Sequence, residues 1–465
     1  MSSKVPLSQI AEIVMGQSPK GEEVNNKGIG LPLLNGPTEF TERYPIPVQH
    51  TAYAKKTSLP GDILFCVRGS TTGRMNYSDQ KYCIGRGLAA IRGRNGYPTP
   101  YIKAILEAYL PELLAAATGS TFPNVSKDLI NNILVEVLPV ANACYISKFI
   151  EAQEEKVFNS NQINKTLEQI AQALFKSWFV DFEPVKAKIA VLEAGGSQEE
   201  AILAAMTAIS GKDADSLAVF EREYPEQYAE LKATAELFPS AMQESELGEI
   251  PVGWKFSSLE DVTSLIIDHR GKTPKKLGGD WSEDGHPAIS AKNIKNGRLV
   301  RHDAIRYVDS NLYAKWMKDT LLAGDILMTS EAPLGELMYL AKDCDYLLSQ
   351  RLYGIRADKE IISGCYLYFW LQTSAAKADI DGRATGSTVV GIRQSELRKV
   401  NVMAPQKAVV ESFSSLTTLY LAKIESNEKQ NIVLEKLRDT LLPKLLSGEI
   451  TLPEAEQAVS EAENV

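Results

Sequence analysis

Two stretches of the chain place apolar residues at steps of three and four, which keeps one face of a long helix apolar. In 143–183 the positions on this face are Ile146, Phe149, Gln153, Val157, Ser160, Asn164, Leu167, Ala171, Leu174 and Trp178. In 406–447 they are Phe413, Leu416, Tyr420, Lys423, Asn427, Gln430, Leu434, Leu437 and Leu441. This spacing is typical of a coiled-coil seam and predicts two long helices that pair antiparallel.

The middle of the predicted seam is polar, because Ser160, Asn164, Asn427 and Gln430 fall on core positions. Burying such groups costs stability, but it can fix the register of the pair, since slippage would leave amides facing leucines. Two amphipathic helices that pack only on their own domains remain an alternative. A helix of about 35 residues spans roughly 50 Å at about 1.5 Å per residue, somewhat more than one turn of B-DNA at about 34 Å.

Outside these helices the pattern is mainly of short strands bounded by turn residues. The strands are expected at 63–67, 88–92, 133–138, 326–329, 352–356 and 400–403, with one helix in each half at about 100–115 and 364–378. A region rich in Ala and Glu between the halves predicts helices at 198–209 and 224–237. The acidic segment after Gly448 is expected to fray.

The two halves of the chain repeat each other. Gly61–Leu64 recurs as Gly324–Leu327, and Ala117–Thr121 recurs as Ala384–Thr388. The offset between matching residues rises from 255 at Gly16 through 263 at Asp62 to 267 at Ala117 and then stays constant through Asn164 and Leu174. Chance matches would scatter, so the stepwise rise indicates one ancestral order with inserted loops.

Together these patterns predict a mixed α/β chain. Two tandem β-rich α/β domains are expected, separated by two long antiparallel coiled-coil helices in a pseudo-twofold arrangement. The expected segments are a first domain at 1–142, a long helix at 143–183, a helical acidic spacer at 184–245, a second domain at 246–405, a second long helix at 406–447 and an acidic tail at 448–465. A duplicated module of this kind suits a protein that grips two equivalent targets at a set separation.

The net charge of −9 argues against a nucleic-acid partner only when it is taken over the whole chain. Residues 1–142 carry a net charge of +3, and residues 246–405 are neutral. The acidity lies in 143–245, with −8, and in 406–465, with −4. The two domains are therefore compatible with a polyanion, since local clusters of charge decide contact with DNA.

The five cysteines lack a CxxC spacing, and the four histidines form no ligand-spaced cluster. This usage predicts reduced thiols in the cytoplasm, without a disulfide framework or a metal site. The chain begins without the apolar core of a signal peptide, and its apolar runs are too short to span a bilayer. A soluble cytoplasmic protein with no membrane partner is expected.

Basic and amide side chains in Gly- and Pro-containing loops are the candidate contacts to double-stranded DNA. Lys and Arg supply salt-dependent affinity for phosphate, and Arg, Asn and Gln can read base edges. In the first copy the candidates are Gln17, Lys20, Asn35, Arg68, Ser70, Thr71, Arg74, Arg86, Ser120, Thr121 and Lys127. In the second they are Arg270, Lys272, Thr273, Lys275, Lys276, Lys292, Asn293, Lys295, Arg298, Arg301, Arg351, Ser387, Thr388 and Arg393. For the repeated Thr-Gly-Ser-Thr segment, a structural turn and a phosphate contact both remain open.

The sequence offers no catalytic constellation. Gly271-Lys272-Thr273 resembles the end of a phosphate-binding loop, but Ile266 stands where the first Gly is required. A GxGxxG fingerprint and an Asn-Pro-Pro-aromatic segment are both missing, which disfavours a methyl-donor site. A non-catalytic DNA-recognition scaffold is therefore the preferred interpretation. The alternatives are a stand-alone enzyme of the DNA methyltransferase type and a coiled-coil adaptor with two binding modules.

In this order, and in two copies, the motifs resemble the specificity subunits of type I restriction-modification systems. The resemblance covers nearly the whole chain and rests on Gly271–Pro274, the two Gly-Asp-Ile-Leu and Ala-Thr-Gly-Ser-Thr segments, Leu247–Trp254 and Leu441–Ile450. The family usually enters each helix through a Pro-Pro-Leu-x-Glu-Gln-like segment. Here that segment is degenerate, at 138–142 and 404–407, which blurs the predicted helix starts.

The resemblance implies that each domain is a target-recognition domain that reads one half of a bipartite, asymmetric DNA site. It also implies that the helices set the gap between the halves and dock two methyltransferase subunits. Two restriction subunits, which are nuclease-translocases, would join through that methyltransferase core. S-adenosylmethionine, ATP and magnesium would then belong to these partners, and no cofactor to this chain.

Overall fold

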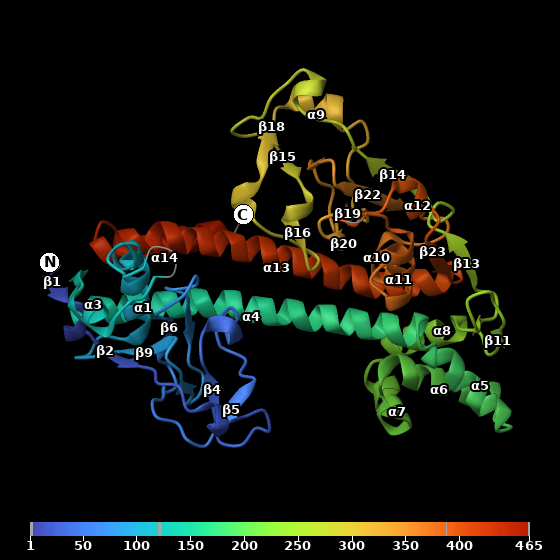
Figure 1. The fold of residues 1–465 in the computed structure, drawn as a ribbon. Helices are drawn as coiled ribbons and strands as arrows, with labels where there is room; N and C mark the ends of the chain where they lie inside the picture. The colour runs from blue at the N-terminus through green and yellow to red at the C-terminus, as the bar shows by residue number, and fades with distance from the viewer. Residues whose placement is uncertain (1–2, 120–122, 387, 464–465) are drawn as a thin grey trace. The chain divides into compact units, whose positions relative to one another are not determined.

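The computed structural model describes residues 3–119, 123–386 and 388–463. The chain forms two compact units, Met1–Ile163 with Asn427–Val465, and Asn164–Ser426 (Figure 1). They are called unit 1 and unit 2 below. Two long helices, α4 (Val140–Phe179) and α13 (Lys407–Ser447), each contribute residues to both units.

Unit 1 is built on a four-stranded antiparallel sheet with the strand order β2-β9-β6-β7. Its strands are β2 (Ala11–Met15), β9 (Leu88–Gly93), β6 (Ile63–Cys66) and β7 (Met75–Tyr77). A second sheet, β3-β5-β4-β8, contains β3 (Val24–Asn25), β5 (Gln49–Thr51), β4 (Leu31–Leu34) and β8 (Cys83–Ile84), and β1 (Ser3–Pro6) pairs with β10 (Leu134–Val137). The helices of this domain are α1 (Thr99–Ala108), α2 (Leu110–Ala115) and α3 (Lys127–Asn132), with 3-10 turns at Leu7–Gln9, Gly21–Glu23 and Pro37–Glu39.

Unit 2 repeats this plan with the strand order β14-β22-β19-β20. Its strands are β14 (Thr263–Asp268), β22 (Leu352–Ala357), β19 (Ile326–Ser330) and β20 (Leu334–Tyr339). A three-stranded sheet has the order β18 (Arg306–Val308), β15 (His286–Ile289) and β21 (Leu347–Leu348). Two further pairs are formed by β16 (Ile294–Lys295) with β17 (Arg298–Leu299) and by β13 (Lys255–Ser258) with β23 (Asn401–Ala404). In the last pair, β11 (Met242–Gln243) lies beside β12 (Ile250–Pro251). Its domain helices are α9 (Ser310–Trp316), α10 (Gly364–Trp370), α11 (Ser374–Arg383) and α12 (Gln394–Leu397), with 3-10 turns at Lys275–Leu277, Ala291–Asn293 and His302–Ala304.

Matching strands in the two units pair in the same way. In unit 1, β4 runs parallel to β8, and in unit 2, β15 runs parallel to β21, while the main sheets are antiparallel. The expected strand positions are correct to within one or two residues at each end. The identical order of strands confirms that the chain contains two copies of one module.

In both copies the aspartate of the Gly-Asp-Ile-Leu segment has the same structural role. Its carboxylate accepts hydrogen bonds from the preceding turn and from an arginine on a central strand. The Asp62 carboxylate accepts hydrogen bonds from the Leu59 amide and from Arg92, both at 2.7 Å. In the second copy, Asp325 accepts two bonds from the Arg356 guanidinium, at 2.8 and 2.7 Å, and one from the Leu322 amide at 2.9 Å. The preceding glycines have φ of +86° and +94°, which side chains disfavour.

We expect Asp325→Ala to lower the free energy of unfolding by about 2 kcal/mol, because a partly buried guanidinium and an amide lose their acceptor. The Arg356 side chain is 23% exposed, so water recovers part of the loss. Equilibrium denaturation in urea measures the effect. Asp303→Ala, at an exposed aspartate of the same unit, is the matched control and should change stability by less than about 0.5 kcal/mol. Equal losses in the two variants would contradict a special role for Asp325.

The long helices pair antiparallel within each unit. In unit 2 the Asn164 amide donates to the Ile424 carbonyl at 3.5 Å, and the Phe175 and Phe413 rings lie 5.6 Å apart. In unit 1 the Asn431 amide donates to Asn161 Oδ1 at 2.8 Å. The seam residues that the sequence predicted are buried or partly buried: Val157, Asn164, Leu167, Leu174, Trp178, Asn427, Leu434, Leu437 and Leu441.

The predicted seam of α13 was wrong in part. Leu416 and Lys423 are exposed, whereas Thr417 and Leu421 are buried and Ile424 packs against the core. Thr417 is tolerated there because its hydroxyl donates to the Phe413 carbonyl at 2.8 Å in the same helix. Asn431 is likewise buried, next to the predicted position Gln430. The polar character of the seam itself is confirmed.

Three other expectations need correction. The helix expected at 100–115 breaks at Tyr109 into α1 and α2, and the helix expected at 364–378 divides into α10 and α11. The spacer contains two more helices than were expected: its four are α5 (Glu183–Glu193), α6 (Gln198–Ser210), α7 (Ala214–Glu223) and α8 (Pro225–Leu237).

The segment after Gly448 does not fray but forms α14 (Leu452–Glu463). Ala455 and Val459, four residues apart, are buried in the core of unit 1. Ile450 and Leu452 pack against the same core, so this helix docks through one apolar face although its composition is acidic.

All five cysteines are free. No helix of the described residues is long and apolar enough to cross a membrane. Within the same part of the chain, three or more His, Cys, Asp or Glu side chains nowhere gather in a way that could hold a metal ion.

Candidate nucleic-acid interface

In unit 1 several loops converge on one end of the main sheet. The Gln17 amide, after β2, donates to the Ile84 carbonyl at 2.8 Å, and the Val67 amide, after β6, donates to the Gly87 carbonyl at 2.9 Å. The Gly69 amide also donates to the Pro123 carbonyl at 3.2 Å. Segments 16–20, 67–74, 85–87 and 123–124 therefore lie together, although they are far apart in sequence.

The loop after β4 joins the same end. Ser18 Oγ lies 3.3 Å from Asn35 Oδ1 and accepts the Arg86 amide at 3.1 Å. A Cβ at Gly85 would lie 2.4 Å from Asn35 Oδ1, so this close approach requires glycine. The exposed candidates that this end brings together are Gln17, Asn35, Arg68, Ser70, Arg74 and Arg86, with Thr71 half-buried beside them.

Two basic candidates of unit 1 lie differently. Lys20 begins a 3-10 turn and pairs with Glu22 at 3.6 Å, an exposed contact of little energetic weight. Lys127 begins α3 and lines a shallow groove along β2 together with Lys56 and Arg94. Lys56 and Arg94 were not among the candidates from the sequence, because only the tertiary fold brings them beside Lys127.

In unit 2 the corresponding loops meet at the corresponding end of the sheet. The Ile392 amide donates to the Ser330 carbonyl at 3.0 Å, and the Ser330 amide donates to the Arg351 carbonyl at 3.0 Å. Gln350 Nε2 donates to the Lys272 carbonyl at 2.7 Å. This end therefore gathers Arg270, Lys272, Thr273, Arg351 and Arg393 from three separate segments, and Thr388 belongs to the same 384–393 loop as Arg393.

Some of these side chains already have partners inside the protein. Lys272 Nζ donates to the Trp316 carbonyl at 2.8 Å, and Lys276 Nζ to the Gly271 carbonyl at 2.9 Å. Burial, with the neighbouring Lys318, lowers the pKa of Lys272. Arg351 pairs with Glu331 at 2.7 Å. Lys275 is exposed and is therefore the lysine of this loop best placed to meet a phosphate.

The candidates between Lys292 and Arg301 of unit 2 lie in different environments in the structure. Asn293 is fully buried, and its amide donates to the Val300 and Arg301 carbonyls, so its side chain holds its own loop together. Lys295 and Arg298 line a cavity whose wall includes Glu168 of α4. Burial raises the pKa of Glu168, and Arg298 opposes the rise. Lys292 and Arg301 are exposed.

The Thr-Gly-Ser-Thr repeat lies only partly within the described residues, because Ser120, Thr121 and Ser387 fall outside them. The flanking backbone is described in both copies. Thr118 and Asn124 exchange backbone hydrogen bonds at 2.9 and 3.3 Å, as Thr385 and Gly391 do at 2.8 and 3.0 Å. In each copy, the described residues that flank the repeat are therefore paired by backbone hydrogen bonds beside the converging sheet end.

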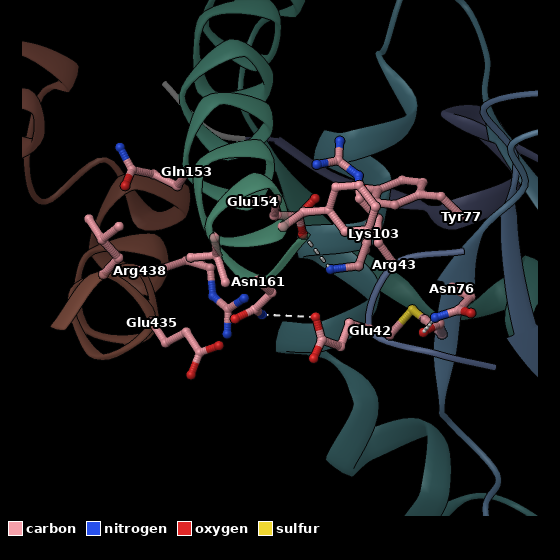
Figure 2. A pocket seen from close by; sticks show the side chains of 14 residues that line it. Glu42, Arg43, Asn76, Tyr77, Lys103, Gln153, Glu154, Asn161, Glu435 and Arg438 are labelled. Carbon is pink, nitrogen blue, oxygen red and sulfur yellow. Dashed lines mark hydrogen bonds and ion pairs between the residues drawn. The ribbon is translucent and has the colours of Figure 1, made fainter. Parts of the chain in front are cut away.

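Polar contacts anchor the loop of unit 1 that begins at Asn35 to the paired helices. Figure 2 shows Glu42, whose carboxylate accepts a hydrogen bond from the Asn161 amide of α4 at 2.8 Å. The Arg43 guanidinium lies 5.7 Å from the centre of the Phe158 ring. Both residues line a cavity of about 210 Å³ between β7, α1, α4 and α13.

A partly buried ion pair also connects α1 of this domain to α4. Lys103 Nζ donates to Glu154 of α4 at 2.7 Å (Figure 2). It also donates to Glu107 at 2.7 Å. Burial alone would lower the pKa of Lys103, but the two carboxylates raise it, so the ammonium stays charged. The contacts of Glu42 and Arg43 therefore hold this loop of unit 1 against α4.

Two copies of one α/β module, each with basic and amide side chains on loops at one end of its sheet, define a protein with two nucleic-acid-binding domains. The family model "Type I restriction modification DNA specificity domain" matches residues 2–169 and 251–436. The chain therefore belongs to the type I restriction-modification specificity subunits, and its two modules are DNA target-recognition domains.

Known relatives agree with this membership. The HindI specificity subunit of Haemophilus influenzae is 32% identical over 415 residues, which cover 85% of this chain and 88% of the relative. The MjaIX specificity subunit of Methanocaldococcus jannaschii is 22% identical over 85% of this chain and 78% of its own length. The crystal structure of a type I S subunit from M. genitalium has the same fold, with a TM-score of 0.56 over 96% of each chain and 12% identity.

Proposed function

We propose that this chain is the non-catalytic DNA reader of a type I restriction-modification complex. Each target-recognition domain reads one half of a bipartite site, and α4 and α13 set the unspecified gap between the halves. The observation that carries the proposal is the convergence of matching loops on matching sheet ends in two domains of different loop sequence. Different side chains at equivalent positions would give an asymmetric target.

The proposal also assigns partners. Two methyltransferase subunits would dock on the paired helices, and two restriction subunits would join through them. S-adenosylmethionine, ATP and magnesium would be bound by those subunits. The printed names of the relatives support the role of specificity subunit, and the docking on the helices rests on membership of that family. The acidity of the chain lies in the spacer and the C-terminal segment, because α4 and α13 themselves are close to neutral.

The test is to express the chain with its methyltransferase subunits and to map the methylated bases in the DNA of the expressing cells. A split motif with a fixed gap is expected, and the purified complex should bind that motif at least about a thousandfold more tightly than unrelated DNA. A continuous short motif would exclude two half-sites. Binding of S-adenosylmethionine by the chain alone in calorimetry would instead favour a stand-alone enzyme.

A phosphate contact is expected at Lys275. Lys275→Ala should weaken binding of the assembled complex to all DNA sequences alike and should lower the slope of log K against log salt by about 1. The matched control is Lys232→Ala, at an exposed lysine of α8 in the spacer, which should leave the slope unchanged. An unchanged slope for Lys275→Ala would remove this residue from the interface.

A further inference from the structure

Arg270 stands out among the basic residues of the second domain, because its guanidinium is held by two groups of that domain. Arg270 Nη2 donates to the Ile392 carbonyl at 2.8 Å and to the Tyr353 hydroxyl. Its Cζ lies 5.4 Å from the centre of the Tyr353 ring. The Arg270 amide is fixed as well, because it donates to Asp268 Oδ1 at 2.9 Å.

Tyr353 provides a rigid base for this arrangement. It lies on the central strand β22, opposite Asp268, and is fully buried. Burial raises the pKa of Tyr353 to about 12, so the phenol stays protonated near neutral pH. Its hydroxyl donates to the Ile392 carbonyl at 2.8 Å. The Ile392 carbonyl thus accepts from both Tyr353 and Arg270, which uses its two lone pairs.

Ile392 lies near the end of the loop of residues 384–393, of which residue 387 is outside the described part of the chain. Its amide is bound to the Ser330 carbonyl, and the loop is closed by backbone bonds between Thr385 and Gly391. Arg270 stands at the start of another loop, residues 269–278, which carries Lys272 and Lys275. The guanidinium therefore joins two candidate reading loops that are more than a hundred residues apart in sequence.

The same bonds exclude the usual base-reading role of arginine. Bidentate recognition of guanine needs two neighbouring N–H groups on one edge of the guanidinium, and each such edge includes Nη2. Both Nη2 hydrogens are committed to Ile392 and Tyr353, so neither edge is free. The remaining donors of the guanidinium, Nε and Nη1, lie on different edges.

The first copy shows that the module folds without this arrangement. By the offsets of the repeat, Met15 stands at the position of Arg270, Ala89 at that of Tyr353 and Val125 at that of Ile392. The backbone bond is kept, because the Val125 amide donates to the Val67 carbonyl at 2.8 Å. Only the side-chain connection is absent, so it serves something particular to the second domain.

We propose that Arg270 is a positioning residue that joins the 269–278 and 384–393 loops into one reading surface and so determines how sharply the second domain discriminates between bases. This inference rests on the proposed function. Affinity gained from phosphates does not require the two loops to keep a fixed spacing, whereas hydrogen bonds to base edges do. Loss of the connection should therefore reduce discrimination more than overall affinity.

The test uses the full chain assembled with its methyltransferase subunits. Competition binding compares the native target with duplexes that carry single base-pair changes in either half-site, at two salt concentrations. Arg270→Lys keeps the positive charge but cannot make both hydrogen bonds, to the Ile392 carbonyl and to the Tyr353 hydroxyl. It should lower the discrimination between the native and the changed base pairs about tenfold, in one half-site only. Tyr353→Phe keeps the aromatic ring but removes the hydroxyl, and it should lower the discrimination between base pairs in the same half-site by about threefold.

The salt slope and the discrimination in the other half-site should match those of the unchanged protein, which a general loss of folding would not allow. If Arg270→Lys discriminates like the unchanged protein, the inference is wrong and the proposed function stands. If Arg270→Ala, which removes the charge, weakens the binding of every duplex equally and lowers the slope, Arg270 is a phosphate contact, and this result also overturns the inference. If the unchanged complex shows no preference for any sequence, the proposed function fails, and the inference fails with it.

Discussion

Replacing Phe413 with alanine should lower the free energy of unfolding by about 3–5 kcal/mol, the largest loss that we expect from a single substitution in this chain. The ring is 1% exposed and lies within 6.0 Å, centre to centre, of Phe175, Trp178, Phe179 and Phe369. Alanine would leave a cavity at the point where α4, α10 and α13 meet and would remove several aromatic pairs. Equilibrium denaturation in urea measures the loss.

Leu416→Ala is the matched control, three residues further along the same helix. Leu416 is 40% exposed, so its truncation should cost less than about 0.5 kcal/mol. The comparison also tests the register of α13, because the sequence pattern placed Leu416 in the seam and the structure places Thr417 there. A loss at Leu416 comparable to that at Phe413 would contradict the structure of this helix pair.

The error at Leu416 shows that hydrophobic periodicity cannot identify a polar residue that is buried through hydrogen bonds to distant partners. The pattern counts leucine as a core residue and threonine as a surface residue. Thr417 can be buried because its hydroxyl bonds to the carbonyl one turn earlier and lies 3.1 Å from Cys365 Sγ on α10. Cys365 is more than fifty residues away in sequence, so no local pattern could have indicated this partner. The strands were easier to predict, because buried apolar runs follow Gly-Asp turns in both copies.

The prediction that the acidic tail would fray was wrong for a related reason. Its composition suggested a solvated segment, but docking requires only the face that carries Ala455 and Val459. Two small side chains in a stretch rich in glutamate give a weak periodic signal. The matching surface on unit 1 comes from α4 and other elements that composition does not identify.

The reading loops could be located from the sequence, but the roles of their side chains could not. Gly, Pro and basic residues marked the loops, and the repeat indicated that both copies use the same positions. Whether a lysine faces solvent depends on distant acceptors, such as the Trp316 carbonyl for Lys272. Asn293 turned inward for the same reason, and Lys56 and Arg94 were missed because the tertiary fold alone brings them beside Lys127.

The largest functional effect is expected from lengthening both long helices. Seven residues would be inserted into α4 between Ile163 and Asn164 and into α13 between Ser426 and Asn427, where each helix passes from one unit to the other. Seven residues add about 10 Å and keep the apolar face within about 20° of its direction. If the helices set the gap, binding to the native target should fall about a thousandfold, to the level of nonspecific DNA.

The lengthened complex should at the same time acquire a new target. At about 3.4 Å per base pair, the preferred gap should grow by about three base pairs while both half-sites stay unchanged. Competition binding with duplexes of stepped gap length measures the shift. The matched control inserts seven glycine- and serine-rich residues between Gly211 and Lys212, in the connection between α6 and α7, and should leave the preferred gap as it was. If the doubly lengthened protein still prefers the native gap, the helices do not set the spacing, and some other contact must hold the two reading domains to their half-sites.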